Sequence, residues 1–397
     1  MHQTLWGSQG KRAYKVGPFS EENSTILQLN HWIKPNIMSL FLFMLLVSIL
    51  NPVVSHKSCD FPAVVNLGDS NSDTGGYASA FTPPTSPYGE TYFHMPARRF
   101  SDGRLTIDFI AEAFGLPFIN AYLDSVGTNF SHGINFATAA STIRLPISVI
   151  PNGGFSPFYL GLQYSQFEQF KVRSQMIRKQ GGLLASLMPK EEYFSKALYT
   201  FDIGQNDLGE GFFSNLTIQE VNASIPDIIN KFSANIKNIY NLGARFFWVL
   251  VAFASAEKDP AGCLKPYNEV AQYFNLKLQE SIAQLRNEFP SAAFTYVDIY
   301  SVKYSLFAEP QKHGFELPLV TCCGYGGEYN YSAAVLCGGT ITVNGTEIFV
   351  GSCDNPSVRV VWDGIHFTEA ANKFIFDQIS TGSFSDPAVP LKQACQS

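Results

Sequence analysis

Short apolar runs alternate with longer amphipathic stretches along most of the chain. Runs that are typical of buried strands lie at 61–67, 133–138, 197–203, 244–253 and 292–299. Patterns with apolar residues three and four positions apart predict helices at 104–115, 162–187, 217–242 and 267–289. Thr368 is expected to cap a last helix that runs to Ser380. This alternation predicts an α/β fold with a mostly parallel sheet that helices cover on both faces.

The stretch 310–360 departs from this alternation. It is rich in glycine and holds Cys322, Cys323, Cys337 and Cys353. Residues 340–350 alternate between polar and apolar, and Asn344-Gly345 in their middle predicts a two-residue hairpin turn. We interpret the stretch as a Cys-rich hairpin insertion within one domain.

The longest apolar run lies near the start of the chain, at 38–50. It is shorter than the about 20 residues that span a bilayer, and small residues follow it. We therefore predict a signal peptide at 38–55, a single secreted domain at 56–397 and no stable membrane span. Residues 1–37 are then an extension outside the native chain, with Met38 as the initiator. An uncleaved signal anchor is the less favoured alternative, because Pro52 ends the run early.

Composition and charge indicate which kinds of molecule the protein is expected to bind. The chain is 46% hydrophobic and 14% aromatic, which is enough to fill a sizeable core. Its net charge is −6 and it has no long basic stretch, so nucleic acid is not an expected partner. We expect neutral small molecules or esters as partners. The oligomeric state is not predicted.

All seven cysteines follow the predicted cleavage point, which fits an oxidising compartment with up to three disulfides and one remaining thiol. Because the ends of compact domains often lie close together, Cys59 and Cys395 are a reasonable pair. The cysteine spacing does not favour zinc, and we expect no metal and no cofactor. Five N-glycosylation sequons, each expected on an exposed loop, begin at Asn129, Asn215, Asn222, Asn330 and Asn344.

Polar residues directly follow the predicted strands. Ser70 follows the first strand and Asn206 the third, and ligands of a parallel sheet bind outside the carboxyl ends of its strands. A serine hydroxyl becomes a nucleophile when a histidine takes its proton and a carboxylate orients that histidine. Asp363 and His366 are close enough in sequence to make such a pair. The Ser70 amide, an amide near Ala140 and the Asn206 side chain are candidate donors to an oxyanion.

Four blocks together resemble those of the plant GDSL esterase/lipase family, within the SGNH hydrolases. They are Gly68-Asp69-Ser70, Gly133-x-Asn135-Phe136-Ala137, Gly204-x-Asn206-Asp207 and Asp363-x-x-His366. The stretches 262–268, 322–326 and 353–357 are similar to the branch that contains early-nodulin-like proteins and members labelled α-fucosidases. The resemblance covers nearly all of 59–397.

The resemblance implies a flavodoxin-like three-layer αβα sandwich with a five-stranded, mostly parallel sheet. It also implies hydrolysis of carboxylic esters through an acyl-enzyme, in the apoplast or the cell wall. By the same resemblance Ser70, Asp363 and His366 form the triad, and Asn206 and Ala140 donate to the oxyanion. The second block usually ends in glycine in this family, whereas this chain has Ala140. At a positive φ its methyl group would strain the backbone beside the oxyanion.

Three functions remain open. The first is an esterase that removes acetyl or other short acyl groups from cell-wall polysaccharide or a small metabolite. The second is an acyltransferase with the same triad, and the third is a catalytically weakened carbohydrate-binding or defence protein, which Ala140 suggests. A glycosidase is disfavoured, because that chemistry usually requires two carboxylates around the bond and no such pair follows the predicted strands.

Overall fold

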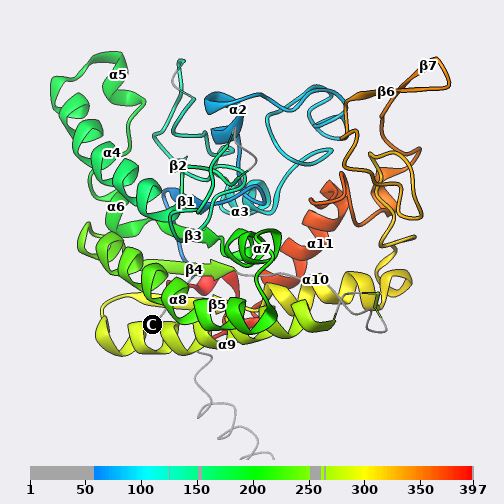
Figure 1. Ribbon diagram of the computed structural model, residues 1–397. Helices are drawn as coiled ribbons and strands as arrows, with labels where there is room; N and C mark the ends of the chain where they lie inside the picture. The colour runs from blue at the N-terminus through cyan, green and yellow to red at the C-terminus, as the bar shows by residue number, and fades with distance from the viewer. Residues whose placement is uncertain (1–57, 125, 151–153, 251–260, 263–264, 396–397) are drawn as a thin grey trace, which may run out of the picture. The chain divides into compact units, whose positions relative to one another are not determined.

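A mostly parallel sheet forms the centre of the computed structural model, which describes residues 58–124, 126–150, 154–250, 261–262 and 265–395 (Figure 1). Its strand order is β2-β1-β3-β4-β5-β8. The five parallel strands are β1 (Val64–Gly68), β2 (Gly133–Asn135), β3 (Leu198–Asp202), β4 (Phe246–Leu250) and β5 (Ala293–Val297). The sixth strand, β8 (Ser385–Asp386), pairs antiparallel with β5. It was not predicted, because two residues carry no readable apolar pattern.

Helices cover both faces of the sheet, as the sequence predicts for an αβα sandwich (Figure 1). One face packs against α4 (Leu160–Gln180), α7 (Gln205–Phe213), α8 (Ile218–Asn241) and α9 (Lys265–Glu288). The other face packs against α3 (Thr106–Ala113), α10 (Ile299–Ala308) and α11 (Glu369–Ile379). Alternate strand residues face the two layers: Val65 belongs to the first core and Val64 to the second. The fully buried strands therefore read as continuous apolar runs.

Most predicted elements form within a few residues of their expected bounds, but one helix is divided. The predicted helix at 162–187 ends at Gln180, and a short helix α5 (Gly182–Ser186) follows it. Gly181 and Gly182 have φ angles of +74° and +76°, which end a right-handed helix. Thr368 caps α11 as predicted, since its side chain accepts the N–H of Ala371. The helices α7 and α10 were not predicted.

Further short elements complete the described residues. These are α2 (Gly76–Ala80), α6 (Tyr193–Lys196), the 3-10 turns Pro310–His313, Pro356–Val358 and Leu391–Gln393, and the hairpin strands β6 (Thr340–Val343) and β7 (Thr346–Phe349). The hairpin turns at Asn344-Gly345 as predicted, and it forms a two-stranded sheet of its own. The predicted extension at 1–37 and signal peptide at 38–55 lie outside the described residues.

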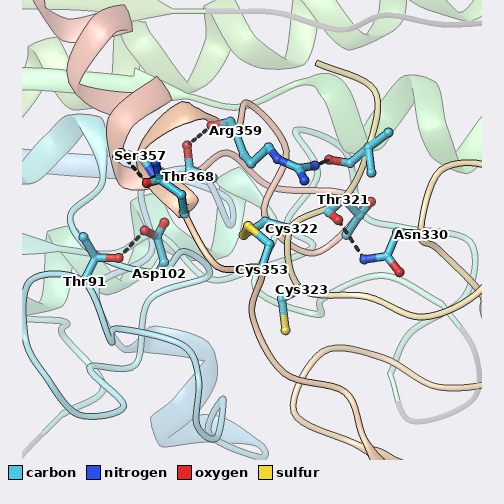
Figure 2. Close-up of a disulfide and its surroundings, with 12 residues drawn as sticks. Thr91, Asp102, Thr321, Cys322, Cys323, Asn330, Cys353, Ser357, Arg359 and Thr368 are labelled. Carbon is cyan, nitrogen blue, oxygen red and sulfur yellow. Dashed lines mark hydrogen bonds between the residues drawn. A yellow bond between two sulfur atoms is a disulfide. The ribbon is translucent and has the colours of Figure 1, made fainter. Parts of the chain in front are cut away.

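Three disulfides join six of the cysteines. Cys59 pairs with Cys395 as predicted, and the insertion holds the pairs Cys322–Cys353 and Cys323–Cys337. Figure 2 shows Cys322 bonded to Cys353 beside the segment that leads into α11, where Thr368 donates to the Arg359 carbonyl oxygen. Cys263 lies outside the described residues.

Candidate active site

Ser70 lies just beyond the carboxyl end of β1. In the sheet, β1 is flanked by β2 and β3. In the strand order 2-1-3-4-5, successive connections run in opposite directions on the two sides of β1, and ligands bind at such a switch point. The turn that holds Ser70 is closed by the Ser72 N–H, which donates to the Asp69 carbonyl oxygen at 3.1 Å. The Ser70 N–H has no hydrogen-bond acceptor among the described residues. That amide is therefore available to a ligand.

Asp363 and His366 form a tight pair in the turn before α11. The Asp363 Oδ2 lies 2.7 Å from His366 Nδ1, and its Oδ1 accepts the N–H groups of Ile365 and His366 at 3.0 and 2.8 Å. Burial acts to raise the pKa of Asp363, but the His366 charge and these hydrogen bonds outweigh it and hold that pKa below its ordinary value. The carboxylate is thus ionised and fixed to Nδ1, which leaves Nε2 as the nitrogen that can take a proton.

Asn206 follows β3, as predicted, and lies in the first turn of α7. Its Nδ2 donates to the Ser141 carbonyl oxygen at 2.9 Å and to Asp69 Oδ2 at 3.3 Å. The acceptors are therefore chain neighbours of Ala140 and Ser70. The structure thus brings together the three segments that were expected to supply oxyanion donors.

Ala140 has a φ of +62°, in the left-handed region that favours glycine. Its carbonyl oxygen accepts the Ser156 N–H at 2.9 Å, and the next amide, that of Ser141, donates to Thr138 at 3.1 Å. The Ala140 N–H itself has no acceptor in the described part of the chain. The methyl group is thus accommodated in a strained conformation that leaves the amide unpaired.

Ser70 and His366 are not hydrogen-bonded to each other among the described residues. Aromatic contacts connect the two segments. The centroid of the Phe100 ring lies 5.1 Å from that of the His366 ring and 5.5 Å from that of the Tyr77 ring. The Tyr77 N–H in turn donates to Asp73, three residues after Ser70. Catalytic hydrogen bonds often form only when substrate binds, so the absence of this bond does not argue against a triad.

Two buried aspartates hold the loops of the site, and sequence reasoning gave neither a role. Asp73 accepts the N–H groups of Gly75, Gly76, Tyr77 and Ala139, and so ties the Ser70 segment to the Ala140 segment. Asp207 accepts the N–H groups of Ile143 and Arg144 at 2.7 and 3.1 Å. A carboxylate among successive Gly, Asn and Ser residues is the signal that could have identified them.

The five sequons differ in their environments. Asn129, Asn215 and Asn344 are exposed, and Asn344 lies at the tip of the β6–β7 hairpin. Asn330 is half-buried in a turn, where its Nδ2 donates to the Thr321 carbonyl oxygen at 2.9 Å (Figure 2). The expectation of an exposed position is therefore wrong for Asn330. It is also wrong for Asn222, which is half-buried in α8 because the helix begins four residues earlier.

Among the residues that the structure describes, no group of three or more His, Cys, Asp or Glu side chains is arranged to hold a metal ion. No helix found there is both long and apolar enough to cross a membrane.

Comparison with known proteins identifies close relatives. The family model described as GDSL-like lipase/acylhydrolase matches residues 64–379. An esterase from Hevea brasiliensis is 63% identical over 88% of this chain and 93% of its own length. The GDSL esterase/lipase ENOD8 of Medicago truncatula is 58% identical over 89% of this chain and 95% of its own. Alpha-L-fucosidase 3 of Arabidopsis thaliana is 49% identical over 91% and 99%.

Proposed function

Because the chain belongs to the family of GDSL-like lipases and acylhydrolases, we propose that it is a secreted serine hydrolase that cleaves short acyl esters through an acyl-enzyme. Relatives named esterase or GDSL esterase/lipase support ester hydrolysis as the class of reaction. Three disulfides support an oxidising, extracellular compartment such as the apoplast or the cell wall. The observation that carries the proposal is the buried 2.7 Å contact between Asp363 and His366.

In the proposed mechanism the Ser70 hydroxyl oxygen attacks the ester carbonyl carbon while His366 Nε2 takes the hydroxyl proton. Asp363 keeps the proton on Nδ1 and stabilises the imidazolium that forms. The negative charge moves to the carbonyl oxygen, where the N–H groups of Ser70 and Ala140, unpaired among the described residues, can stabilise it. The Asn206 amide can join them by exchanging its 3.3 Å bond to Asp69 for one to the oxyanion. Collapse expels the alcohol, which receives the proton from His366. A water molecule then repeats these steps on the acyl-enzyme and releases the acid.

The decisive experiment compares the purified protein with its Ser70→Ala variant on p-nitrophenyl acetate. We expect full turnover in the first and only a small residual rate in the second. A fluorophosphonate should add one phosphonyl group to Ser70, which peptide mass spectrometry locates. If His366 activates Ser70, the double variant Ser70→Ala/His366→Ala should be little less active than either single variant. Turnover that survives Ser70→Ala undiminished would refute the assignment.

Two alternatives keep the same site and are separated by further measurements. An acyltransferase would form a new ester when an acceptor alcohol is added, at the expense of free acid. A weakened binding protein is favoured by one observation, the left-handed Ala140 beside the proposed oxyanion position. It would bind acylated oligosaccharide yet show no Ser70-dependent turnover.

A further inference from the structure

The Tyr88 hydroxyl donates a hydrogen bond to Asp363 Oδ2 at 2.9 Å, although the two residues are 275 positions apart. The same oxygen accepts from His366 Nδ1. We propose that Tyr88 is a positioning residue that limits how strongly Asp363 holds the proton of His366, and so sets the pH range of the enzyme. This inference rests on the function proposed above.

The surroundings of Tyr88 hold its hydroxyl in one place. Its ring is buried, with centroids 6.1 Å from Phe100 and 6.0 Å from Trp362, both edge-on. Its main chain is anchored on both sides, since the Tyr88 N–H donates to Thr85 and the Gly89 N–H donates to Ser101. Ser101 in turn donates through Oγ to the Phe367 carbonyl oxygen, next to His366. The loop that carries Tyr88 is therefore attached to the turn that carries the histidine.

The two oxygens of Asp363 are occupied in different ways. Oδ1 accepts the main-chain N–H groups of Ile365 and His366. These bonds do not depend on the side chains at positions 365 and 366. Oδ2 accepts two side chains, His366 and Tyr88. Burial and the Asp363 charge raise the pKa of the Tyr88 hydroxyl far above its usual value, so it remains a donor throughout the working range. Tyr88 therefore competes with His366 for the negative charge of one oxygen.

This competition predicts the direction in which the activity profile moves along the pH axis when Tyr88 is replaced. A carboxylate that is stabilised by a second donor attracts the imidazolium less, so the histidine loses its proton at a lower pH. Replacing Tyr88 by phenylalanine leaves more charge on Oδ2, stabilises the imidazolium and delays formation of the neutral base. The acid limb of the activity profile should then move to higher pH.

Other ionisable groups around the turn have different partners. Asp102 accepts the Glu369 N–H and the Thr91 hydroxyl, and burial raises its pKa. Glu369 is paired with Arg104 at 2.7 Å. The Lys303 ammonium lies 5.1 Å from the Phe367 ring, and the Tyr331 ring lies against Gly364. Within the described residues, His366 and Tyr88 are the side chains that donate to Asp363.

The test measures kcat/KM for p-nitrophenyl acetate between pH 4.5 and 8.5 in wild-type and Tyr88→Phe protein. We expect the acid-side midpoint to rise by about 0.5–1 pH unit, with KM nearly unchanged. The matched control is Tyr199→Phe, which removes another buried hydroxyl bond, to the Phe194 carbonyl oxygen in the core. It should leave the midpoint in place. A midpoint in Tyr88→Phe that is unchanged or lower would overturn the inference.

Two further measurements keep the inference testable if Tyr88→Phe does not fold or if the protein hydrolyses no ester. If Tyr88→Phe does not fold, 3-fluorotyrosine placed at position 88 keeps the ring and donates a stronger bond, so the midpoint should fall. If the protein hydrolyses no ester, the proposed function fails, yet the coupling can still be measured. The His366 ring signals, assigned by their loss in His366→Asn, should then titrate by NMR at a higher pH in Tyr88→Phe than in wild type. No difference would refute the role of Tyr88.

Discussion

Ala140 combines a left-handed backbone with a side chain, at a φ of +62°. An L-residue with a Cβ pays about 1 kcal/mol for this conformation, which glycine adopts without strain. The hydrogen bond from Ser156 to the Ala140 carbonyl oxygen helps to hold the strained segment in place. The strain therefore affects an amide that we assign to the oxyanion site.

We predict that Ala140→Gly raises kcat by a few-fold or more, up to about 100-fold, with KM nearly constant. Relief of the strain lets the amide follow the developing oxyanion, and a donor that strengthens only then acts on turnover. Thermal stability should not fall, because the relieved strain offsets the about 0.5–1 kcal/mol that glycine costs through the unfolded state. Steady-state kinetics and thermal melts check both points. Unchanged kcat with an intact fold would show that the alanine does not impair the site.

Asn206 is assigned a different donor, its side-chain amide. Asn206→Ala should lower kcat by about 10²–10³-fold with little effect on KM. The control is Gln205→Ala, because Gln205 also donates to Asp69, at 3.2 Å, but has no assigned role at the oxyanion. Equal losses in the two variants would mean that the bond to Asp69, and not the oxyanion, explains the effect.

At the scale of elements, the Cys-rich insertion supports the segment before the Asp363–His366 turn. The N–H groups of Cys322 and Cys323 donate to the carbonyl oxygens of Val361 and Trp362 at 3.0 and 2.7 Å. The Trp362 N–H then closes the turn on the His366 carbonyl oxygen at 2.7 Å. Cys323, Cys337 and Trp362 also share one buried cluster with Tyr88. The insertion therefore contributes to the placement of His366, although none of its own residues is assigned to the chemistry.

Removing Cys323–Cys337 with a double serine variant should lower the free energy of unfolding by about 3 kcal/mol and kcat by about tenfold. The control removes Cys59–Cys395, which joins the ends of the described domain. Its longer loop makes the expected loss about 5–6 kcal/mol, while kcat at a temperature where the protein stays folded should be unchanged. Urea unfolding and kinetics separate the two effects. Loss of kcat in both variants alike would contradict a specific support of the turn.

At the scale of the whole molecule, several carboxyl groups in and around the site are buried. Burial raises the pKa values of Asp69, Asp73, Asp102 and Asp202, and the Asp202 charge raises that of Asp69 further. Burial also raises the pKa of Asp207 from 3.8 to about 7, against the opposing hydrogen bonds from Ile143 and Arg144. The folded protein therefore binds protons more tightly at these groups than the unfolded chain does.

This difference predicts that the free energy of unfolding falls as the pH rises from about 4 to about 7. A carboxyl with a raised folded-state pKa stabilises the fold below its unfolded pKa, and that stability is lost as the pH rises through the folded pKa. Asp207→Asn cannot ionise, so urea unfolding between pH 4.5 and 7.5 should show a weaker dependence on pH. A variant with the wild-type slope would show that Asp207 does not titrate in this range. Asp363 contributes in the opposite direction, because its folded-state pKa is lowered: its contribution to the free energy of unfolding is lost as the pH falls.

Local patterns along the chain were sufficient to predict the layers of this protein and the positions of its candidate groups. Apolar runs located the five parallel strands, and the spacing of Asp363 and His366 predicted their contact, because both depend on neighbours within a few residues. The break in the predicted helix at Gly181 and Gly182 was not predicted, because a pattern averaged over many residues hides individual left-handed positions.

Only the tertiary structure decided how distant segments meet. The bond from Tyr88 to Asp363, the unpaired amide of Ala140 and the contact between Asn206 and Asp69 depend on strand order and on how loops from different strands pack. The same holds for the pairing within the Cys322-Cys323 dipeptide, where each cysteine bonds a different partner. Such contacts follow from the joint placement of many side chains, which no local periodicity encodes.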